Sequence, residues 1–255
     1  MTYRRVNESS SSLMPKIDRT MLGDIGVFPD RGTADEYGLL CIGGELTPWW
    51  VLAAYFQGIF PWPIQVDNQE EVLGWFCPDP RAVIPPGVMH IPKRLQRKLR
   101  SGRFRITSDQ AFDAVIAGCA GPRQGQDGTW ITAELIEGYR ELHQLGFVHS
   151  LEVWESDTLV GGVYGLSIGG YFSAESMFHT VSDASKAALA VLGRHLVEQG
   201  FTLWDIQQNS EHCSRLGAIE MPREAFLAQH AASISLDVEF GEIDTDTNSH
   251  LLLIG

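Results

Sequence analysis

The chain has 255 residues, of which 44% are hydrophobic and 20% are charged, and it carries a net charge of −13. This composition is typical of a globular protein, and the length allows one large domain or two unequal ones. No stretch approaches the roughly 20 apolar residues that a membrane-spanning helix requires, which argues against a membrane protein.

The N-terminal segment and the cysteines indicate a cytoplasmic protein. Residues 1–20 contain two arginines and a serine run but lack the apolar segment of a secretory signal, so we interpret them as a flexible tail. The four cysteines are widely separated and form no CxxC pair: Cys41, Cys77, Cys119 and Cys213. This spacing argues against a disulfide framework or a zinc site, so we expect no bound metal.

The first structured region is rich in glycine, proline and tryptophan and contains one helical pattern, at residues 48–57. Thr47 is a candidate N-cap residue, Pro48 suits the first turn, and Gly58 ends the pattern. A region with so little regular structure cannot bury much surface alone. We therefore expect a small N-terminal α/β domain that depends on the rest of the chain.

A basic cluster follows at residues 93–105, where seven of the 19 basic residues occur in thirteen positions without an acidic residue. Its members are Lys93, Arg94, Arg97, Lys98, Arg100, Arg103 and Arg105. Such a cluster can neutralise phosphates locally although the whole chain is acidic. It can equally be the solvated face of an amphipathic helix that buries Leu95 and Leu99. The residues alone leave both interpretations open.

The second half of the chain has a more regular pattern of elements. Two helices are predicted at residues 108–119 and 132–145, followed by an antiparallel meander of three strands at 147–155, 158–168 and 171–178. A helix that starts at Ser182 or Asp183 and ends at residue 199 comes next. A strand at 201–207 and a short helix at 211–216 complete the pattern. This α+β order resembles the acyltransferase fold of N-acetyltransferases, with a mixed sheet and flanking helices.

The same patterns suggest where the domains divide. The Pro-Asp-Pro stretch at residues 78–80 is the expected boundary between a small domain at 21–80 and an acyltransferase-like domain at 81–235. Residues 236–255 are acidic and then apolar, and we expect a tail of unknown role.

Two glycine-rich motifs match known functional motifs, but their positions in the predicted strands argue against those functions. Residues 165–169 match GxSxG, but a nucleophile elbow needs a strand followed by a helix, whereas here a second strand follows. We therefore interpret these glycines as part of a hairpin. Residues 161–165 suggest a coenzyme A pyrophosphate loop, yet they lie inside a strand pattern rather than before a helix.

Asp205 and Gln207 are the most informative polar pair. Both should point to one face of the strand at 201–207, among apolar neighbours that make an unpaired charge costly. A catalytic role is one interpretation. The alternative is that Asp205 caps the following short helix or pairs with His212.

Two further positions attract attention. Glu175 lies in an aromatic strand, on the face of Ser173 and Met177 and opposite Phe172 and Phe178, where a structural hydrogen bond is the default interpretation. In addition, Trp130 precedes a helix start, where it could stack on a base or fill the core.

Several segments together resemble the leucyl/phenylalanyl-tRNA-protein transferase family. They are GLLCIGGELTP (38–48), YFQGIFPW (55–62), WFCPDPRAVI (75–84), GTWIT (128–132), LHQLGFVHSLEVWESDTLVGGVYG (142–165), ESMF (175–178), ASKAAL (184–189), and DIQ with a following His and LGA (205–218). They occur in order over roughly residues 37–225, which is most of the chain.

The resemblance implies a function and residue roles. Members of this family move Leu or Phe, sometimes Met, from charged tRNA to proteins that begin with Arg or Lys, which marks these proteins for N-end rule degradation. By this resemblance Asp205 and Gln207 are catalytic, with the Asp polarising the Gln so that the incoming amine loses a proton. The remaining implied site residues are Glu175, Phe172, Val163, Met177 and Leu192 in the aminoacyl pocket, Trp62 and Trp130 at the terminal adenosine, and Lys93, Arg94, Arg97, Lys98 and Arg100 at tRNA phosphates.

The chain departs from the family pattern at several positions. Ile206 replaces the cysteine of Asp-Cys-Gln, Val163 stands where Met is frequent, and Leu192 and Leu196 replace pocket aromatics. These changes keep an apolar pocket but bear on the choice between Leu and Phe. Two alternatives to the transferase are a coenzyme-A-dependent N-acyltransferase of the same fold and a non-catalytic tRNA-binding protein.

The chemistry implied by the resemblance needs no cofactor. An aminoacyl ester is already activated, so the protein must supply only position and a deprotonated amine. The α-amine of a protein has a pKa of about 8, so a nearby acceptor suffices to remove its proton.

Overall fold

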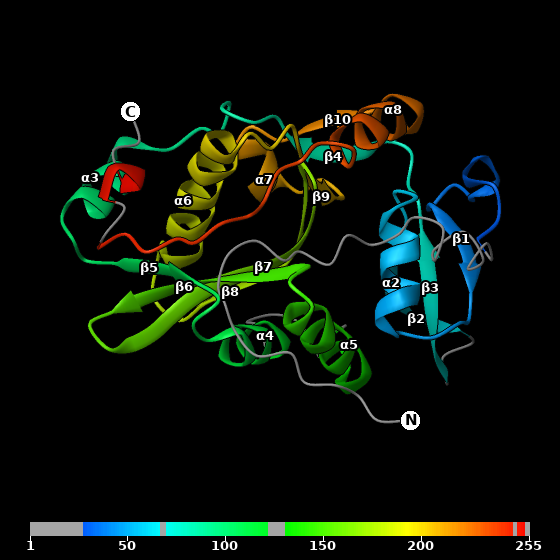
Figure 1. The fold of residues 1–255 in the computed structure, drawn as a ribbon, viewed down its shortest axis with the longest axis horizontal. Helices are drawn as coiled ribbons and strands as arrows, with labels where there is room; N and C mark the ends of the chain where they lie inside the picture. The colour runs from blue at the N-terminus through cyan, green and yellow to red at the C-terminus, as the bar shows by residue number, and fades with distance from the viewer. Residues whose placement is uncertain (1–27, 67–69, 122–130, 247–248, 253–255) are drawn as a thin grey trace, which may run out of the picture.

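The computed structural model describes residues 28–66, 70–121, 131–246 and 249–252. In this part of the chain the fold is α+β, with a three-stranded sheet beside a seven-stranded mixed sheet (Figure 1). The expected tail at residues 1–20, the loop at 122–128 and Trp130 lie outside the described residues.

The small sheet has the order β1-β3-β2 and is antiparallel throughout. Its strands are β1 (Leu39–Ile42), β2 (Phe60–Val66) and β3 (Glu70–Phe76), preceded by the 3₁₀ turn η1 (Arg31–Thr33). The helix α2 (Pro48–Tyr55) begins with Pro48 after an extended Thr47, as the sequence predicts. The strands β1 to β3 were not predicted.

The large sheet has the order β10-β4-β9-β8-β7-β6-β5. Its strands are β4 (Arg81–Ile84), β5 (Arg105–Ser108), β6 (Val148–Glu155), β7 (Thr158–Ile168), β8 (Tyr171–His179), β9 (Leu203–Gln207) and β10 (Ile219–Met221). All neighbours are antiparallel except β8 and β9, which are parallel. The predicted meander is confirmed as β6, β7 and β8.

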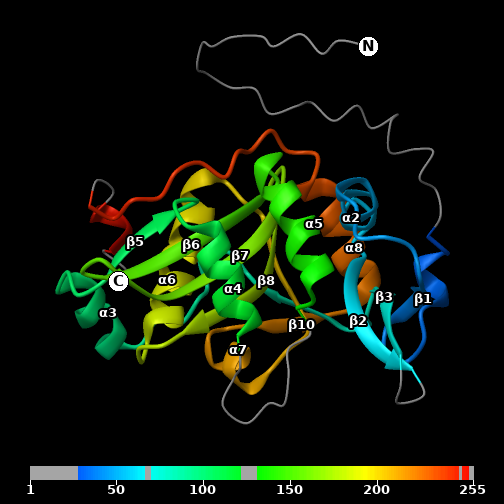
Figure 2. The same cartoon turned by 90° about the horizontal axis from the view of Figure 1, so that it is seen from below.

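Helices cover both faces of the large sheet, as the two views show (Figures 1 and 2). The helices α4 (Phe112–Ala120) and α5 (Ala133–Gln144) pack on one face with residues of α2 and β2. The helices α3 (Lys93–Arg100) and α6 (Ala184–Gln199) pack on the other. The remaining helical segments are α7 (Glu211–Arg215), α8 (Arg223–Ser233) and the 3₁₀ turn η2 (Ser249–Leu252).

The hydrophobic core on the α4 and α5 face is continuous with the small sheet. Tyr55 of α2 and Trp75 of β3 belong to the same buried cluster as Tyr139 of α5. The approach is close enough that a Cβ on Gly138 would lie 2.4 Å from the carbonyl oxygen of Leu46. The small sheet therefore completes its core on the large one, which fits the expectation that it cannot bury much alone. A domain boundary near residue 80 stays a prediction.

The segment after α8 packs against the edge strand β5. Ser108 donates its backbone N–H to Ile243, and Thr245 donates to Ile106. Phe240 and Ile243 are buried in the core on the α6 face. This segment thus covers the exposed edge of the sheet, which would otherwise offer unpaired backbone groups.

One helix start and one capping bond differ from the sequence prediction. The helix expected from Ser108 begins at Phe112, because Ser108 belongs to β5 and its hydroxyl accepts from Ile243 N. The first turn of α4 is instead satisfied from β6, where Glu152 accepts from Ala111 N at 3.3 Å. Asp183 precedes α6 in a left-handed conformation, but its carboxylate makes no capping bond.

Candidate active site

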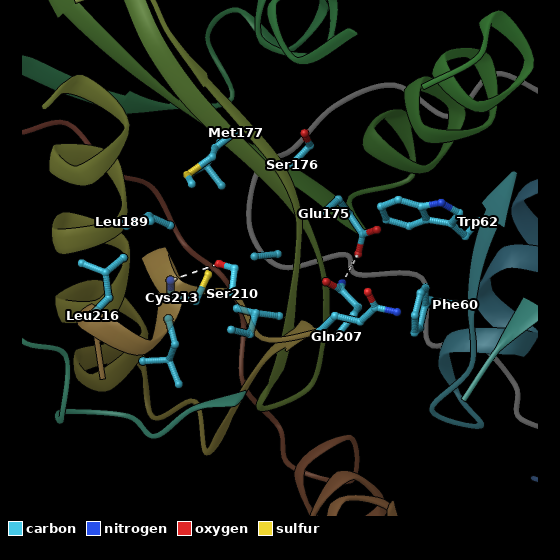
Figure 3. A pocket seen from close by; sticks show the side chains of 15 residues that line it. Phe60, Trp62, Glu175, Ser176, Met177, Leu189, Gln207, Ser210, Cys213 and Leu216 are labelled. Atoms are coloured by element: carbon cyan, nitrogen blue, oxygen red, sulfur yellow. Dashed lines mark hydrogen bonds between the residues drawn. The ribbon is translucent and has the colours of Figure 1, made fainter. Parts of the chain in front are cut away.

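A cavity of about 320 Å³ lies where β8 and β9 separate. The two strands pair only as far as Ser173 and Asp205, and the cavity is lined by the residues that follow, 174–177 and 206–208. Phe60 and Trp62 from β2 form one wall. The opposite wall is apolar and comes from the α6 face of the large sheet and from α7 (Figure 3): Ile84, Val163, Met177, Leu189, Cys213 and Leu216.

A β-bulge aims Glu175 into this cavity. Gly165 pairs with Ala174 and Tyr164 pairs with Ser176, so Glu175 is the extra residue of β8. The bulge reverses the alternation that follows. Met177 therefore packs on the α6 face and Phe178 on the α4 face, whereas the sequence placed Met177 on the face of Ser173.

Glu175 is held by hydrogen bonds from three sides. Its carboxylate accepts from the Tyr139 hydroxyl at 3.0 Å, from the Ser173 hydroxyl at 2.9 Å and from Gln207 Nε2 at 3.3 Å. Burial raises the pKa of Glu175 to about 7, although the hydroxyl donors oppose that shift. Glu175 therefore changes its charge in the neutral pH range, inside the cavity.

We predict that the Glu175 carboxyl makes stability depend on pH. Its folded pKa of about 7 lies above the ordinary value of 4.5, so the native state prefers the protonated form. This contribution is fully present below pH 4.5 and is lost as the pH rises through 7. Urea titrations of the wild type and Glu175→Gln should show their difference in free energy of unfolding changing across this window. A difference that is constant from pH 4.5 to pH 8 would contradict the assignment.

Gln207 ends β9 and points its amide toward Glu175 (Figure 3). Its Nε2 donates to the Ser173 hydroxyl at 2.7 Å and to Glu175. The Gln207 backbone is in the left-handed region, with φ of 59°, which costs a residue with a side chain about 1 kcal/mol or more. Because Nε2 is engaged with the protein, the carbonyl oxygen of the amide is the acceptor that Gln207 presents to the cavity.

Asp205 lies beneath the cavity and does not line it. Its side chain is fully buried and accepts from Arg81 Nε at 2.9 Å, Arg81 Nη2 at 2.6 Å and the Tyr171 hydroxyl at 2.7 Å. A fourth bond, of 2.9 Å, comes from the backbone N–H of Gln207. Asp205 therefore contacts the backbone of Gln207 rather than its amide, and the expected polarisation of the amide by Asp205 is not seen. The alternatives of a helix cap or a His212 pair are also wrong, since Ser210 caps α7 and the donors to the Asp205 carboxylate are Arg81, Tyr171 and Gln207.

Arg81 is the buried partner that the sequence did not reveal. Its guanidinium is fully buried between the rings of Phe60 and Phe226, at 4.6 and 4.5 Å from their centroids. Burial alone would lower the pKa of Arg81, but the ion pair with Asp205 raises it above the ordinary value. The Arg81 guanidinium is thus charged, and the polar atoms of both partners are hydrogen-bonded.

Some of the remaining residues expected in the pocket line the cavity and others do not. Val163 and Met177 line the cavity, and so does Trp62, of which 38% is exposed. Phe172 and Leu192 do not line it, because both are fully buried in the core on the α6 face, where Phe172 stacks on Phe240. Sequence reasoning missed Phe60, Leu189, Cys213 and Leu216, whose apolar character gives no signal beyond that of core residues.

The basic cluster is divided among several partners. Lys93 and Arg97 are exposed on α3 and form no ion pair with another described residue. Arg94 and Lys98 instead pair with Asp183 ahead of α6, and Lys186 lies 3.6 Å from the same carboxylate. These contacts lower the pKa of Asp183 to about 2. The helix also ends at Arg100, so Arg103 and Arg105, which pair with Glu155 and with Asp244 and Asp246, lie beyond it.

The two glycine-rich motifs lie in β7, except for Gly169, which lies in the turn between β7 and β8. Ser167 is buried in this strand, so the hairpin interpretation of GxSxG holds and a nucleophile elbow is excluded. Gly161 and Gly162 allow close packing, since added Cβ atoms would lie 2.9 Å from Ala184 Cβ and 2.7 Å from the Leu151 carbonyl oxygen. They form no loop before a helix.

The described residues contain neither a candidate membrane-spanning helix nor a candidate cluster of metal ligands. No helix among them is both long enough and apolar enough to cross a membrane. Within the same residues, no group of three or more His, Cys, Asp or Glu side chains is arranged to hold a metal ion.

The chain is similar to proteins of one family over most of its length. Residues 83–231 match the family model described as leucyl/phenylalanyl-tRNA protein transferase, and residues 44–79 match the model of its N-terminal domain. The leucyl/phenylalanyl-tRNA–protein transferase of Anaeromyxobacter dehalogenans is 48% identical over 208 residues, 81% of this chain and 88% of the relative. The transferase of the same name from Shewanella baltica is 49% identical over 199 residues, 78% of this chain and 82% of the relative. That from Desulforapulum autotrophicum is 47% identical over 215 residues, 84% of this chain and 92% of the relative. The chain therefore belongs to the leucyl/phenylalanyl-tRNA–protein transferase family.

Proposed function

We propose that the protein transfers leucine or phenylalanine from aminoacyl-tRNA to the N-terminal α-amine of cytoplasmic proteins that begin with Arg or Lys, and so marks them for N-end rule degradation. The observation that supports this most strongly is the joining of an apolar wall and a carboxylate–amide pair in one cavity. Glu175 and Gln207 line the same cavity as Val163, Met177 and Leu189.

The apolar wall suits the side chain of the transferred amino acid. Leu and Phe differ by only a few carbon atoms, and a hydrophobic pocket separates such side chains by about 1–3 kcal/mol. Met177 adds a flexible thioether that adapts to either shape. We therefore expect loose selection, which extends to Met.

The polar edge suits the attacking amine. In the reaction the amine nitrogen forms a bond to the ester carbonyl carbon, and the bond from that carbon to the terminal ribose oxygen breaks. The amine loses one proton and the ribose hydroxyl gains one. We assign to the Gln207 carbonyl oxygen the hydrogen bond that orients the amine. The nearby Glu175 carboxylate accepts the proton that the amine loses. Asp205 is shielded by its own donors and serves to hold Gln207.

We assign the terminal adenosine to the aromatic edge of the cavity. Trp62 lies at the mouth with 38% of its surface exposed, and base–aromatic stacking contributes about 1–3 kcal/mol. Trp130, which precedes α5 but lies outside the described residues, is assigned to the same nucleoside by the family resemblance.

We predict that Lys93 and Arg97, two exposed residues of the basic cluster on α3, bind tRNA phosphates. The double variant Lys93→Gln with Arg97→Gln should weaken tRNA binding and flatten the slope of log K against log salt concentration by about 1–2 units. Filter binding at several salt concentrations measures this slope. Arg103→Gln is the matched control, because Arg103 is paired with Glu155 at 2.7 Å. An equal change in both proteins would contradict the assignment.

A coenzyme-A-dependent acyltransferase is the alternative of the same fold. The segment before α6, where a pyrophosphate would meet the helix N-terminus, carries the Asp183 carboxylate, which occupies Lys98 and Arg94. This disfavours an anionic cofactor there. Labelled acetyl-CoA, Leu-tRNA and Phe-tRNA, each supplied with a peptide that begins with Arg, test the donor. We expect label in the peptide from the two tRNAs. Transfer from acetyl-CoA, or binding of tRNA without transfer, would reject the proposal.

A further inference from the structure

Arg81 connects the two sides of the cavity without lining it. Through Nε and Nη2 it binds both carboxylate oxygens of Asp205, and through Nη1 it donates to the Gly58 carbonyl oxygen at 3.1 Å. Its guanidinium also lies between Phe60 and Phe226. Arg81 begins β4, the strand next to β9, so it reaches the small sheet from within the large one.

We propose that Arg81 is a positioning residue for aminoacyl transfer, which fixes the Gln207 amide and the wall opposite it in one arrangement. The inference rests on the proposed function of the cavity. Arg81 contacts no substrate in this proposal and acts through Asp205 and through the segment of Gly58 and Phe60.

Arg81 holds Gln207 in place through Asp205. Asp205 Oδ1 accepts from both Arg81 Nε and the backbone N–H of Gln207. The Gln207 backbone is left-handed, a conformation that a residue with a side chain adopts only when its surroundings hold it there. A carboxylate anchored by the planar guanidinium at two points cannot rotate away from this N–H. The orientation of the Gln207 amide, 2.7 Å from Ser173, therefore depends on Arg81.

Arg81 also holds the wall of the cavity that faces Gln207. Phe60 lines the cavity on the side facing Gln207, as Figure 3 shows, and it follows Gly58 by two residues. The guanidinium binds the Gly58 carbonyl oxygen and packs on the Phe60 ring. Arg81 thus sets the separation between the amide and the wall that contains Phe60 and Trp62. Misplacement by about 1 Å is enough to slow a reaction of this kind about 100-fold.

The chemistry of the side chain explains why arginine is needed. The guanidinium offers five donors in one plane and two faces for ring contacts, so it serves Asp205, Gly58 and both rings at once. Lysine keeps the charge opposite Asp205 but cannot make the two-point contact and also reach the Gly58 carbonyl. Arg81→Lys therefore preserves a buried cation and folding while it loosens the positions of Asp205 and Phe60.

Steady-state transfer by Arg81→Lys and Arg81→Gln, with Phe-tRNA and an Arg peptide, tests the proposal. We expect kcat to fall about 10-fold or more in Arg81→Lys and about 100-fold in Arg81→Gln, with little change in KM for Phe-tRNA. Arg31→Gln is the matched control, because Arg31 also donates to a carbonyl of this segment, that of Gln57 at 3.1 Å, and has no bond to Asp205. It should keep the wild-type kcat.

A double-variant cycle separates positioning from a purely structural role. If Arg81 acts through Gln207 as well as through Phe60, then Arg81→Lys lowers kcat less in Gln207→Ala than in the wild type, because only the loss through Phe60 remains there, although its effect on the melting temperature is the same in both backgrounds. Wild-type kcat in Arg81→Lys, or equal losses of kcat in both backgrounds, would overturn the inference. A wild-type protein that transfers nothing from Phe-tRNA would instead reject the proposed function, so the two failures are distinguishable.

Discussion

Replacement of Gln207 by alanine is expected to lower kcat for aminoacyl transfer about 100- to 1,000-fold, the range found when a positioned donor or acceptor is removed from a reacting centre. The amide meets Ser173 and Glu175 through Nε2, which leaves its carbonyl oxygen for the amine. Because the Gln207 carbonyl oxygen contacts the amine of the acceptor peptide and not the aminoacyl-tRNA, the affinity for Phe-tRNA should stay unchanged. Rapid-quench measurement of single-turnover transfer, together with tRNA binding, checks both expectations.

Two companion variants make this result specific. Gln207→Asn tolerates the left-handed backbone well and keeps an amide, but shortens the side chain by one carbon, so it should fold normally and still react slowly. Gln208→Ala removes the neighbouring amide, which also lines the cavity, and should retain most of the activity. A Gln207→Ala protein as fast as Gln208→Ala would reject the role given to Gln207.

The largest loss of stability is expected for Asp205→Ala. This change leaves the Arg81 guanidinium buried without its carboxylate, and breaking one partner of a buried ion pair costs about 3–5 kcal/mol. In a chain of this size each kcal/mol shifts the melting temperature by about 2–4 °C, so a decrease on the order of 10 °C should appear in calorimetry. Activity should fall as well, because the Gln207 N–H loses its acceptor.

The control for this prediction removes both charges. Replacement of the pair by Arg81→Met with Asp205→Leu exchanges the ion pair for apolar side chains, which often costs little stability. The double variant should therefore melt well above Asp205→Ala while remaining slow in transfer. If Asp205→Ala melts with the wild type, the carboxylate is not the buried partner that the geometry describes.

Much of the regular structure could be predicted because local signals agreed with tertiary packing. The strand β7 is a nearly continuous buried run bounded by turn residues, and α5 begins at a Thr132 cap that accepts from Leu135 N. The predicted helix caps were wrong where the capping side chain binds a group that is distant in the sequence. Ser108 binds the C-terminal segment, and Asp183 binds α3, so neither starts a helix by its own side chain.

The site was predictable in part for a similar reason. Asp205, Glu175 and Gln207 are polar residues in apolar strands, and such residues attract attention in a sequence. Their relation was not predictable, since a one-residue bulge redirects Glu175 toward Gln207 and the buried cation comes from β4, 124 residues away from Asp205. Apolar residues of the cavity, such as Leu189, resemble core residues in every sequence property.

Mass spectrometry of peptides incubated with the protein and Phe-tRNA or Leu-tRNA shows whether the protein transfers an amino acid to a free N-terminus. The peptides begin with Arg, Lys or Ala, and a fourth begins with Arg but has an acetylated N-terminus. We predict that the free Arg and Lys peptides gain one Phe or Leu residue at the N-terminus, while the Ala and acetylated peptides do not. Transfer to the acetylated peptide, or no transfer to any peptide, would contradict the account.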